Sequence, residues 1–332
     1  MIPVWSEAIN KACDLLVSNV WLRNIMQEIL KEFEMFTPNE RKKYMIKQQE
    51  EFLKSIDSVK LVEKIRKFRA LNIKDMEMQE IAEALSEVLT WNGSFCYLTN
   101  MGTYSKGTPF FRIRKLKGSS IPNKNLAVYG DFWEPPKSCV KVGGRLNKKG
   151  ESLLYVTPGD PKVPLKELHI VEGEWYALIK YVALEQVKVN IIGGQYDYSA
   201  IGFTDDTAIL NNNLINDFLK DEFSRDVGKG TEYLYKISEI IAKWYFDLPP
   251  ENVQDAWAYS SIQDKEKYNV CFRPEIAHKL LKLEGALICK KEKSDDISVR
   301  CIAIGAKAED KAYFYPLGSE QQKRIFPEIL IK

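Results

Sequence analysis

Apolar residues recur every three or four positions from about Trp5 to Val88, among many Glu and Lys residues. This spacing predicts amphipathic helices, because it collects the apolar side chains on one helix face. Pro38 interrupts the stretch, and Thr37 or Asn39 is suited to cap a helix whose first turn contains that proline. We therefore expect one helix to end just before Thr37 and the next to begin beside Pro38.

The pattern changes near Trp91-Asn92-Gly93, where short β-branched and aromatic runs bounded by Gly and Pro replace the long amphipathic stretches. Such runs are typical of strands. We expect strands at 110–114, 152–156, 175–184, 188–193, 255–262, 269–272, 286–292 and 299–306, and helices at 163–173 and 232–246. The strands and helices do not alternate strictly, which favours an α+β fold over a doubly wound sheet. The sequence thus predicts a helical N-terminal domain over 1–92 and a mixed domain over 93–332.

Composition describes a globular chain with little net charge. Its 332 residues, 45% hydrophobic and 28% charged, suit two domains and exclude a disordered or collagen-like chain. The formal charge of +2 means that no overall electrostatic field attracts nucleic acid or an anionic membrane, although this charge does not exclude a local basic cleft. No run approaches the roughly 18 apolar residues of a membrane span, and the first residues do not read as a secretory signal. We therefore expect a cytoplasmic protein without direct nucleic-acid or membrane binding.

The sequence lacks the residues that several common chemistries require. The six cysteines form no C-x-x-C pair and the chain has two histidines, so we expect reduced thiols and no metal site. No G-x-G-x-x-G occurs, and the nearest P-loop lookalike, Gly102 to Gly107, is followed by Thr108-Pro109. A dinucleotide would therefore not bind through a Rossmann turn.

The segment GDFWEPPKSCVKVGGRLNKKGESLLYV, residues 130–156, is the most informative one. Gly143 and Gly144 allow a tight turn and a close approach to a ligand, and Arg145 follows with donors that match phosphate oxygens. This combination suits an anionic ligand. A surface hairpin with an exposed arginine is the alternative.

Two further segments contain candidate polar residues. Pro164 suits the first turn of a helix, and Glu167, three residues later, faces either inward or outward. Ser260 and Ser261 end a predicted strand, where serines are commonly turn formers, and Asn269 opens the next strand. Taken singly, each of these residues is compatible with a surface role.

Taken together and in order, these segments resemble the RES domain, a family named for an Arg, a Glu and a Ser. The similarity covers about 110–272, and its most specific part is the pattern G-R-x-N-x-x-G-x-x-x-L-Y over 144–155. The segments that carry it are FFRIR with Arg112, GDFWEPP, GGRLNKKGESLLYV with Arg145 and Tyr155, then Glu167, and AWAYSSI with Ser261.

The resemblance implies an ADP-ribosyltransferase-like β core with helices, in a cytoplasmic bacterial toxin or NAD-depleting effector. It implies that NAD⁺ is the substrate, that the bond between nicotinamide and ribose is cleaved, and that no cofactor is required. With water as acceptor the protein is an NAD⁺ glycohydrolase, and with phosphate it is a phosphorylase; protein ADP-ribosylation ranks third. In many family members the partner is a helix-turn-helix antitoxin.

The family residues carry over one by one. The first arginine maps onto Arg112, with Arg114 as the neighbouring alternative, and the serine maps onto Ser261, with Ser260 one residue away. The resemblance implies catalytic roles for Glu167, Arg145 and Ser261. It implies substrate binding by Arg112, Arg114, Tyr155, Asn147, Trp133 and Ser260.

The chemistry of NAD⁺ gives these roles a physical basis. Two guanidinium groups, those of Arg112 and Arg145, would bind the pyrophosphate through charge-assisted hydrogen bonds. Cleavage of an N-glycosidic bond develops positive charge on the ribose, which the carboxylate of Glu167 would stabilise. The rings of Tyr155 and Trp133 either stack on the ligand or belong to the core.

Two departures from the family pattern keep other functions open. Ser260 stands where many relatives have a proline, and the helical 1–92 segment lies outside the resemblance. A regulatory module that binds a nucleotide without cleaving it is therefore an alternative to the enzyme. For the enzyme and for the regulatory module alike, we expect the N-terminal helices to bind an antitoxin or regulatory protein or to form a homo-oligomer.

Overall fold

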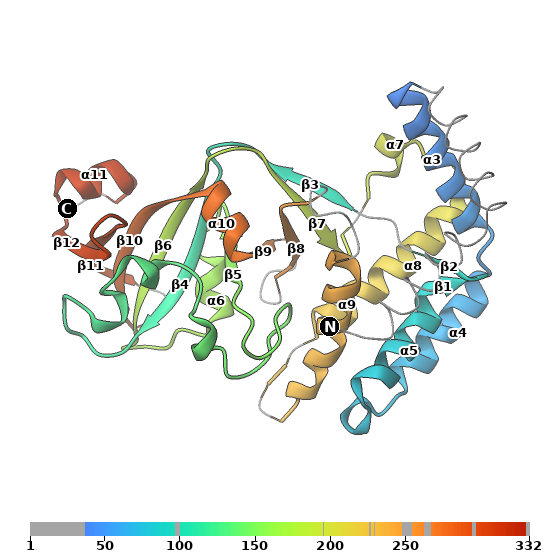
Figure 1. Cartoon of the computed structure of the whole chain (residues 1–332), viewed down its shortest axis with the longest axis horizontal. Coiled ribbons are helices and arrows are strands. Elements are labelled where there is room, and N and C mark those ends of the chain that lie inside the picture. Colours follow the sequence, from blue (N-terminus) through green and yellow to red (C-terminus); the bar gives the residue numbers. More distant parts are fainter. Residues whose placement is uncertain are drawn as a thin grey trace, which may run out of the picture. The chain divides into compact units, whose positions relative to one another are not determined.

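The computed structural model describes residues 37–96, 100–194, 196–225, 227–228, 230–247, 254–261, 267–293 and 297–329. The helices expected before residue 37 lie outside the described residues. The chain divides into two compact units, one running to Asp57 and including Asp197–Asn211, and the other holding Ser58–Tyr196 and Asn212–Lys332 (Figure 1). Among the helices of the described ranges, none has the length and apolarity needed to cross a membrane.

The first unit contains helices α3 (Pro38–Lys54) and α7 (Tyr198–Ile201). A capping box begins α3: the backbone N–H of Thr37 donates to Glu40 Oε2 at 2.7 Å, and the Glu40 N–H donates to Thr37 Oγ1 at 3.4 Å. At the other end of α3, the amide of Asn211 donates to the carbonyls of Leu53 and Ile56, both at 2.9 Å. The predicted start of a helix beside Pro38 is confirmed, and of the two candidate caps, Thr37 and Asn39, the structure shows Thr37.

Longer helices of the chain are α4 (Ser58–Arg69), α5 (Met78–Leu89), α8 (Asp206–Phe223) and α9 (Tyr235–Asp247). In α4 and α5 the buried residues follow the predicted helical spacing: Leu61, Ile65 and Phe68, then Ile81, Leu85, Val88 and Leu89. Although both helices fall inside the predicted 1–92 domain, they belong to the same compact unit as the sheet. The division at residue 92 stays a prediction.

A ten-stranded sheet dominates the second unit, in the order β12-β11-β10-β6-β4-β5-β9-β8-β7-β3. Neighbouring strands are antiparallel except for β7 and β8. The bounds are β3 Met101–Tyr104, β4 Pro109–Leu116, β5 Leu154–Pro158, β6 Trp175–Ala183, β7 Val187–Ile192, β8 Ala256–Ser260, β9 Tyr268–Phe272, β10 Leu281–Lys291, β11 Ile297–Ala306 and β12 Lys311–Pro316. A two-stranded sheet pairs β1 (Thr90–Trp91) with β2 (Ser94–Phe95). Every strand expected from the sequence is present, and the mixed α+β class is confirmed.

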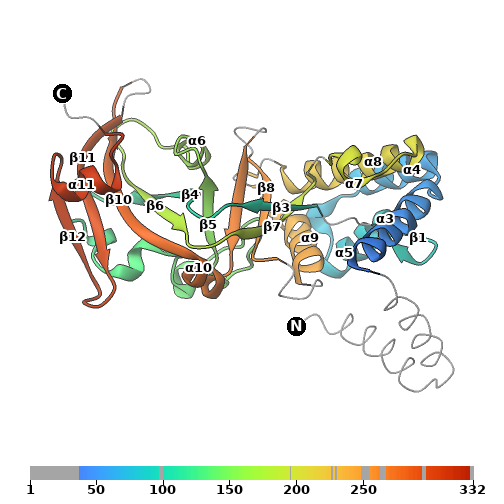
Figure 2. The same cartoon turned by 90° about the horizontal axis from the view of Figure 1, so that it is seen from above.

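Short helices pack on both faces of the sheet. α10 (Pro274–Leu280) packs on the face that carries Phe110, Val156 and Phe272, whereas α6 (Val163–Glu167) and α11 (Glu320–Ile325) accompany the face of Phe111 and Ile113. Figure 2 shows α6 and α10 on opposite sides of β5. Because side chains alternate along a strand, neighbouring residues such as Phe110 and Phe111 serve different cores.

The sheet is joined at its middle by a short ladder. β4 pairs with β5 only through Phe110 with Pro158 and Phe111 with Thr157. Beyond Phe111, β4 continues along β6 as far as Leu116, whereas β5 continues along β9. The two strands therefore diverge, and the residues after Phe111 on β4 have no partner in β5 along the described ladder.

Gly193 follows β7 and lets α8 approach closely. Its φ of +58° lies in the left-handed region, and a Cβ at this position would lie 2.6 Å from the backbone N and Cα of Lys220. A side chain would therefore meet both backbone strain and a rigid helix.

We expect Gly193→Ala to destabilise the second unit more than a glycine replacement in open space. Gly173 has a φ of +83°, and a Cβ added there would have no atom within 4 Å. Gly173→Ala should lower the free energy of unfolding by about 1–2 kcal/mol through strain alone. Gly193→Ala should cost about 1–3 kcal/mol more, because α8 must shift. Urea unfolding of both variants measures the difference, and equal losses would contradict the close contact.

Candidate functional site

A cavity of about 460 Å³ lies where β4 and β5 diverge. One wall is β4, another is β5 and α6, and the loop between β4 and β5 completes it. The lining residues on these elements include Phe111, Arg112, Ile113, Lys141, Asn147, Glu151, Tyr155, Val156, Thr157, Pro164 and Glu167, and they are joined by Tyr259 of β8 and Asn269 of β9. Several residues expected from the sequence thus meet at one place.

Strand alternation gives this cavity a polar floor. The apolar residues Val156, Val270 and Ala258 of β5, β9 and β8 face the core. Their neighbours in sequence point the other way. This second face carries Tyr155, Thr157, Asn269, Tyr259 and, just after β8, Ser261.

Glu167, the last residue of α6, is held by side chains of this polar floor. The hydroxyl of Ser261 donates to Glu167 Oε1, and the amide of Asn269 donates to the same oxygen at 3.2 Å. Thr157 Oγ1 donates to Asn269 Oδ1 at 3.0 Å, which orients that amide with its nitrogen toward Glu167. The carboxylate therefore points inward with a fixed orientation.

Of the two candidate serines, Ser261 is the one that contacts Glu167. Ser260 is the last residue of β8, pairs with Tyr268 of β9, and is buried. Since alternate residues of a strand point to opposite faces, Ser260 lies on the core side of the floor.

The glycine-arginine motif forms a turn that is tied to β5. The hydroxyl of Tyr155 donates to Asn147 Oδ1 at 2.8 Å and accepts from the backbone N–H of Leu146 at 3.1 Å. The Gly144 N–H donates to the Asn147 carbonyl at 2.8 Å. A Cβ on Gly144 would lie 2.6 Å from Asn147 Oδ1, so a side chain there would displace the amide that Tyr155 bonds. Asn147 and Tyr155 both line the cavity.

Arg145 does not appear among the described residues that line the cavity. Its guanidinium donates to the carbonyl of Phe223 and, at 2.8 Å, to that of Arg225, and it lies 5.9 Å from the ring centre of Tyr235. These carbonyls belong to the last residue of α8 and to a residue just beyond it, where a cation is favourable. The structure thus does not bring Arg112 and Arg145 together around one cavity, as the sequence had led us to expect.

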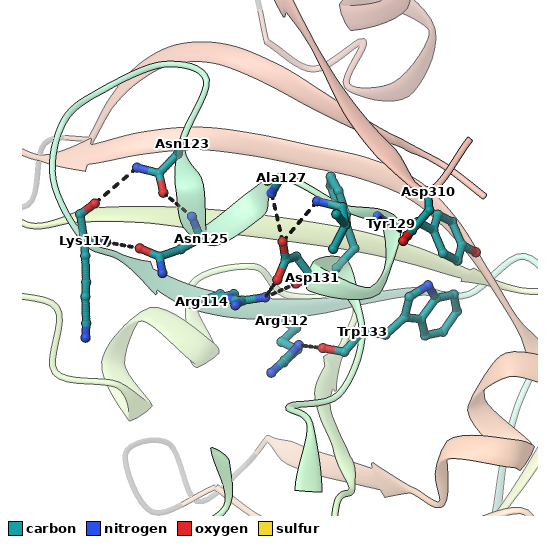
Figure 3. A network of polar contacts seen from close by, with 12 residues as sticks. Arg112, Arg114, Lys117, Asn123, Asn125, Ala127, Tyr129, Asp131, Trp133 and Asp310 are labelled. Atoms are coloured by element: carbon teal, nitrogen blue, oxygen red, sulfur yellow. Dashed lines mark hydrogen bonds and ion pairs between the residues drawn. The ribbon is translucent and has the colours of Figure 1, made fainter. Parts of the chain in front are cut away.

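Arg112 and Arg114 are adjacent on one face of β4 but have different surroundings (Figure 3). Arg112 donates to the carbonyl of Trp133 and lines the cavity. Arg114 donates to the carbonyl of Asp131 and forms an ion pair with its carboxylate at 3.1 Å. That carboxylate also accepts from the backbone N–H of Ala127 at 2.8 Å, so Arg114 supports a loop. Arg112 is therefore the stronger ligand-binding candidate.

The structure places Trp133 in the core. Its side chain is 3% exposed, lies 5.2 Å from the ring of Tyr181, and stacks on His278 at 4.2 Å. His278 in turn contacts Glu134 at 3.1 Å. Stacking of Trp133 on a ligand stays a prediction.

Charges of both signs surround the cavity. The described lining residues include the cations Arg112 and Lys141 and the acids Glu151 and Glu167. Glu151 accepts from the backbone N–H of Lys148 at 3.0 Å. Within the described ranges, His, Cys, Asp and Glu side chains form no group of three that would suit a metal ion.

Three residues of the polar floor, Thr157, Tyr259 and Asn269, were not expected to take part in the site. The period-two pattern from Tyr155 would have placed Thr157 on the same face. To predict the position of Asn269, one would have to know that β9 pairs between β5 and β8, which are far apart in the sequence.

Buried phenols and thiols predict a loss of stability at high pH. Burial raises the pKa of Tyr155 well above its usual value, that of Tyr181 to about 12, and that of Cys301 to about 11. Because the unfolded chain releases these protons first, their contribution is complete below the unfolded-state pKa values and is lost as pH rises through the folded-state values. The free energy of unfolding should therefore fall from about pH 9 towards pH 12.

Tyr155→Phe should lose about 1 kcal/mol at pH 7 through its hydrogen bonds, and its stability should fall less steeply above about pH 10. The exposed Tyr44 provides the control variant, Tyr44→Phe, which should follow the unmodified protein. Urea titrations at a series of pH values measure both slopes. Parallel curves for Tyr155→Phe and the unmodified protein would contradict the buried hydroxyl.

Comparison of the chain with family models, with curated proteins and with solved structures found no match. The resemblance to the RES domain therefore rests on the motif residues alone. The geometry adds that Glu167, Ser261, Asn147 and Tyr155 lie in or beside one cavity, together with Arg112.

Proposed function

We propose that this protein degrades NAD⁺ by cleaving the bond between nicotinamide and ribose. The observation that carries the proposal is the carboxylate of Glu167, held by Ser261 and Asn269 at the wall of a cavity that Arg112 also lines. A fixed carboxylate stabilises the positive charge that develops on a ribose as its N-glycosidic bond breaks. Its orientation is set before the ligand arrives, which avoids reorganisation during the reaction.

The ligand contacts that we assign differ from those expected from the sequence. Among the described residues, the cations that line the cavity are Arg112 and Lys141, whereas Arg145 does not line it and donates to the carbonyls of Phe223 and Arg225. We therefore assign the pyrophosphate to Arg112 and Lys141, through charge-assisted hydrogen bonds. The volume of about 460 Å³ falls within the range of roughly 300–1,000 Å³ that is common for small-molecule sites.

Cleavage requires no general acid in this scheme. The electrons of the C–N bond pass to the cationic nicotinamide ring, which leaves as a neutral molecule. The oxygen of water or of inorganic phosphate then bonds to the ribose carbon, and a proton is released when water is the acceptor. The hydroxyl of Ser261 donates a hydrogen bond to Glu167, so Ser261 positions the carboxylate and is not assigned as a nucleophile.

In this proposal the protein is a RES-type toxin or a regulated NAD-depleting effector of the bacterial cytoplasm. Its acceptor is water or phosphate before a protein side chain. The helices α3, α4 and α5 lie outside the segment that resembles the RES domain. They support a regulated form, in which an antitoxin or another regulatory protein, or a second copy of the chain, binds the helical part.

Glu167→Gln should lower the rate of nicotinamide release at least about 100-fold, because the amide cannot stabilise the positive ribose. The melting temperature should change little, since an amide oxygen still accepts from Ser261 and Asn269. The exposed Glu172 gives a matched control, Glu172→Gln, which should keep the full rate. Chromatography of NAD⁺ reactions measures nicotinamide, and the product nucleotide with and without phosphate identifies the acceptor.

Full activity of Glu167→Gln would contradict the role of this carboxylate. Calorimetric binding of NAD⁺ by the unmodified protein, with no nicotinamide after hours, would replace the enzyme by a nucleotide-binding module. Loss of rate in both glutamine variants would also count against the assignment.

A further inference from the structure

A buried carboxylate holds the C-terminal end of α8. The side chain of Glu222 is 1% exposed and lies between two guanidinium groups, with Arg225 Nη2 at 2.6 Å and Arg69 Nε at 3.3 Å. Arg69 is the last residue of α4, so this cluster joins α4 to α8. A carboxylate so deeply buried depends on its two cationic partners, because an unpaired buried charge is costly.

The same helix end supports the cavity in two ways. The carbonyls of Phe223 and Arg225, on either side of Ser224, accept both hydrogen bonds of Arg145. The ring of Phe223 packs edge-on against the cavity-lining Tyr259, with ring centres 5.2 Å apart. Displacement of the end of α8 would therefore move both Arg145 and a wall of the cavity.

Arg145 connects the end of α8 to the turn beside the cavity. It stands between Gly144 and Leu146, whose backbone N–H groups bond to the Asn147 carbonyl and to the hydroxyl of Tyr155. Tyr155 and Asn147 line the cavity. A series of polar contacts, joined through the chain at Arg225 and Arg145, thus runs from Arg69 and Glu222 to the cavity wall.

We propose that Glu222 is a positioning residue of the cavity, acting through Arg225 and Arg145 on the turn at residues 143–147. Removal of its charge leaves Arg69 and Arg225 without their buried partner, and the two carbonyls that hold Arg145 lose their fixed position. Helix α4, which lies outside the RES-like segment, then belongs to the machinery that shapes the cavity. For its effect on catalysis the proposal rests on the proposed function, whereas its structural part does not.

The chain contains a matched control next to Glu222. Asp221 also pairs with Arg69, at 2.8 Å, but its side chain is 64% exposed. An exposed pair of this kind contributes little to structure. Asp221→Asn and Glu222→Gln each remove one negative charge from adjacent positions beside the same arginine, so they differ mainly in burial.

Hydrogen exchange followed by mass spectrometry on the full chain tests the proposal without any need for activity. Glu222→Gln should speed exchange of the 143–147 amides by about tenfold. Arg145 would no longer be held in place, so the turn at 143–147 would open more often. Asp221→Asn should leave them unchanged. Strand β6, residues 175–183, serves as the internal reference and should exchange equally in all proteins. Unchanged exchange at 143–147 in Glu222→Gln, or an equal increase in β6, would overturn the proposal.

Arg145→Lys provides a second variant that keeps Glu222 and its ion pairs intact. Lysine keeps the charge but lacks the planar fork that reaches two carbonyls, so it should speed exchange at 143–147 alone. This variant decides the matter if Glu222→Gln fails to fold, and normal protection at 143–147 would overturn the proposal. Combined with Glu222→Gln it should add little, because both act through one contact series.

Nicotinamide release separates this inference from the proposed function. If the unmodified protein cleaves NAD⁺, Glu222→Gln should lower kcat about tenfold through misplacement of the cavity wall, with Asp221→Asn unaffected. If the unmodified protein does not cleave NAD⁺, the proposed function fails while the exchange result still stands. Tenfold faster exchange with an unchanged kcat would overturn the catalytic part of the inference.

Discussion

The candidate site depends on the shortness of the ladder between β4 and β5. Two residue pairs, Phe110 with Pro158 and Phe111 with Thr157, connect the two halves of the sheet. A longer ladder would bring the two strands together and close the space that the cavity occupies. Because the strands diverge, Arg112 on β4 and Tyr155 on β5 line one cavity.

Close packing on the opposite face of these strands fixes which side chains point into the opening. Val156, Val270 and Ala258 pack into the core on one face of the strands, which fixes the direction of the polar residues on the other face. Glu167 reaches that polar face from α6, only nine positions after the end of β5 at Pro158. The site therefore combines a rigid floor with a carboxylate on a short connection, an arrangement that holds catalytic groups in place.

Local patterns predicted much of the fold. The helix start at Pro38 follows from the capping residues Thr37 and Glu40, which are neighbours in sequence. The strands follow from apolar runs. Helix α8 was not expected, because its sequence DTAILNNNLINDFLKDEF contains three consecutive asparagines, which have low helix propensity. Asn211, Asn212 and Asn216 are buried, so tertiary contacts override local preference there.

The site was predictable only in part, for the same reason. The motif residues indicated Glu167 and Ser261, and the structure brings them into hydrogen-bonding contact. The sequence assigned Arg145 to a ligand because an arginine after two glycines suits phosphate. Its partners at Phe223 and Arg225 lie about 80 residues further along the chain, and no local pattern shows such contacts.

The most direct test of the account is a crystal structure of the Glu167→Gln chain with bound NAD⁺. The account predicts the dinucleotide in the cavity between β4 and β5, with its pyrophosphate at Arg112 and Lys141. The ribose carbon that carries nicotinamide should face position 167. A dinucleotide bound elsewhere, or one whose nicotinamide ribose points away from position 167, would contradict it.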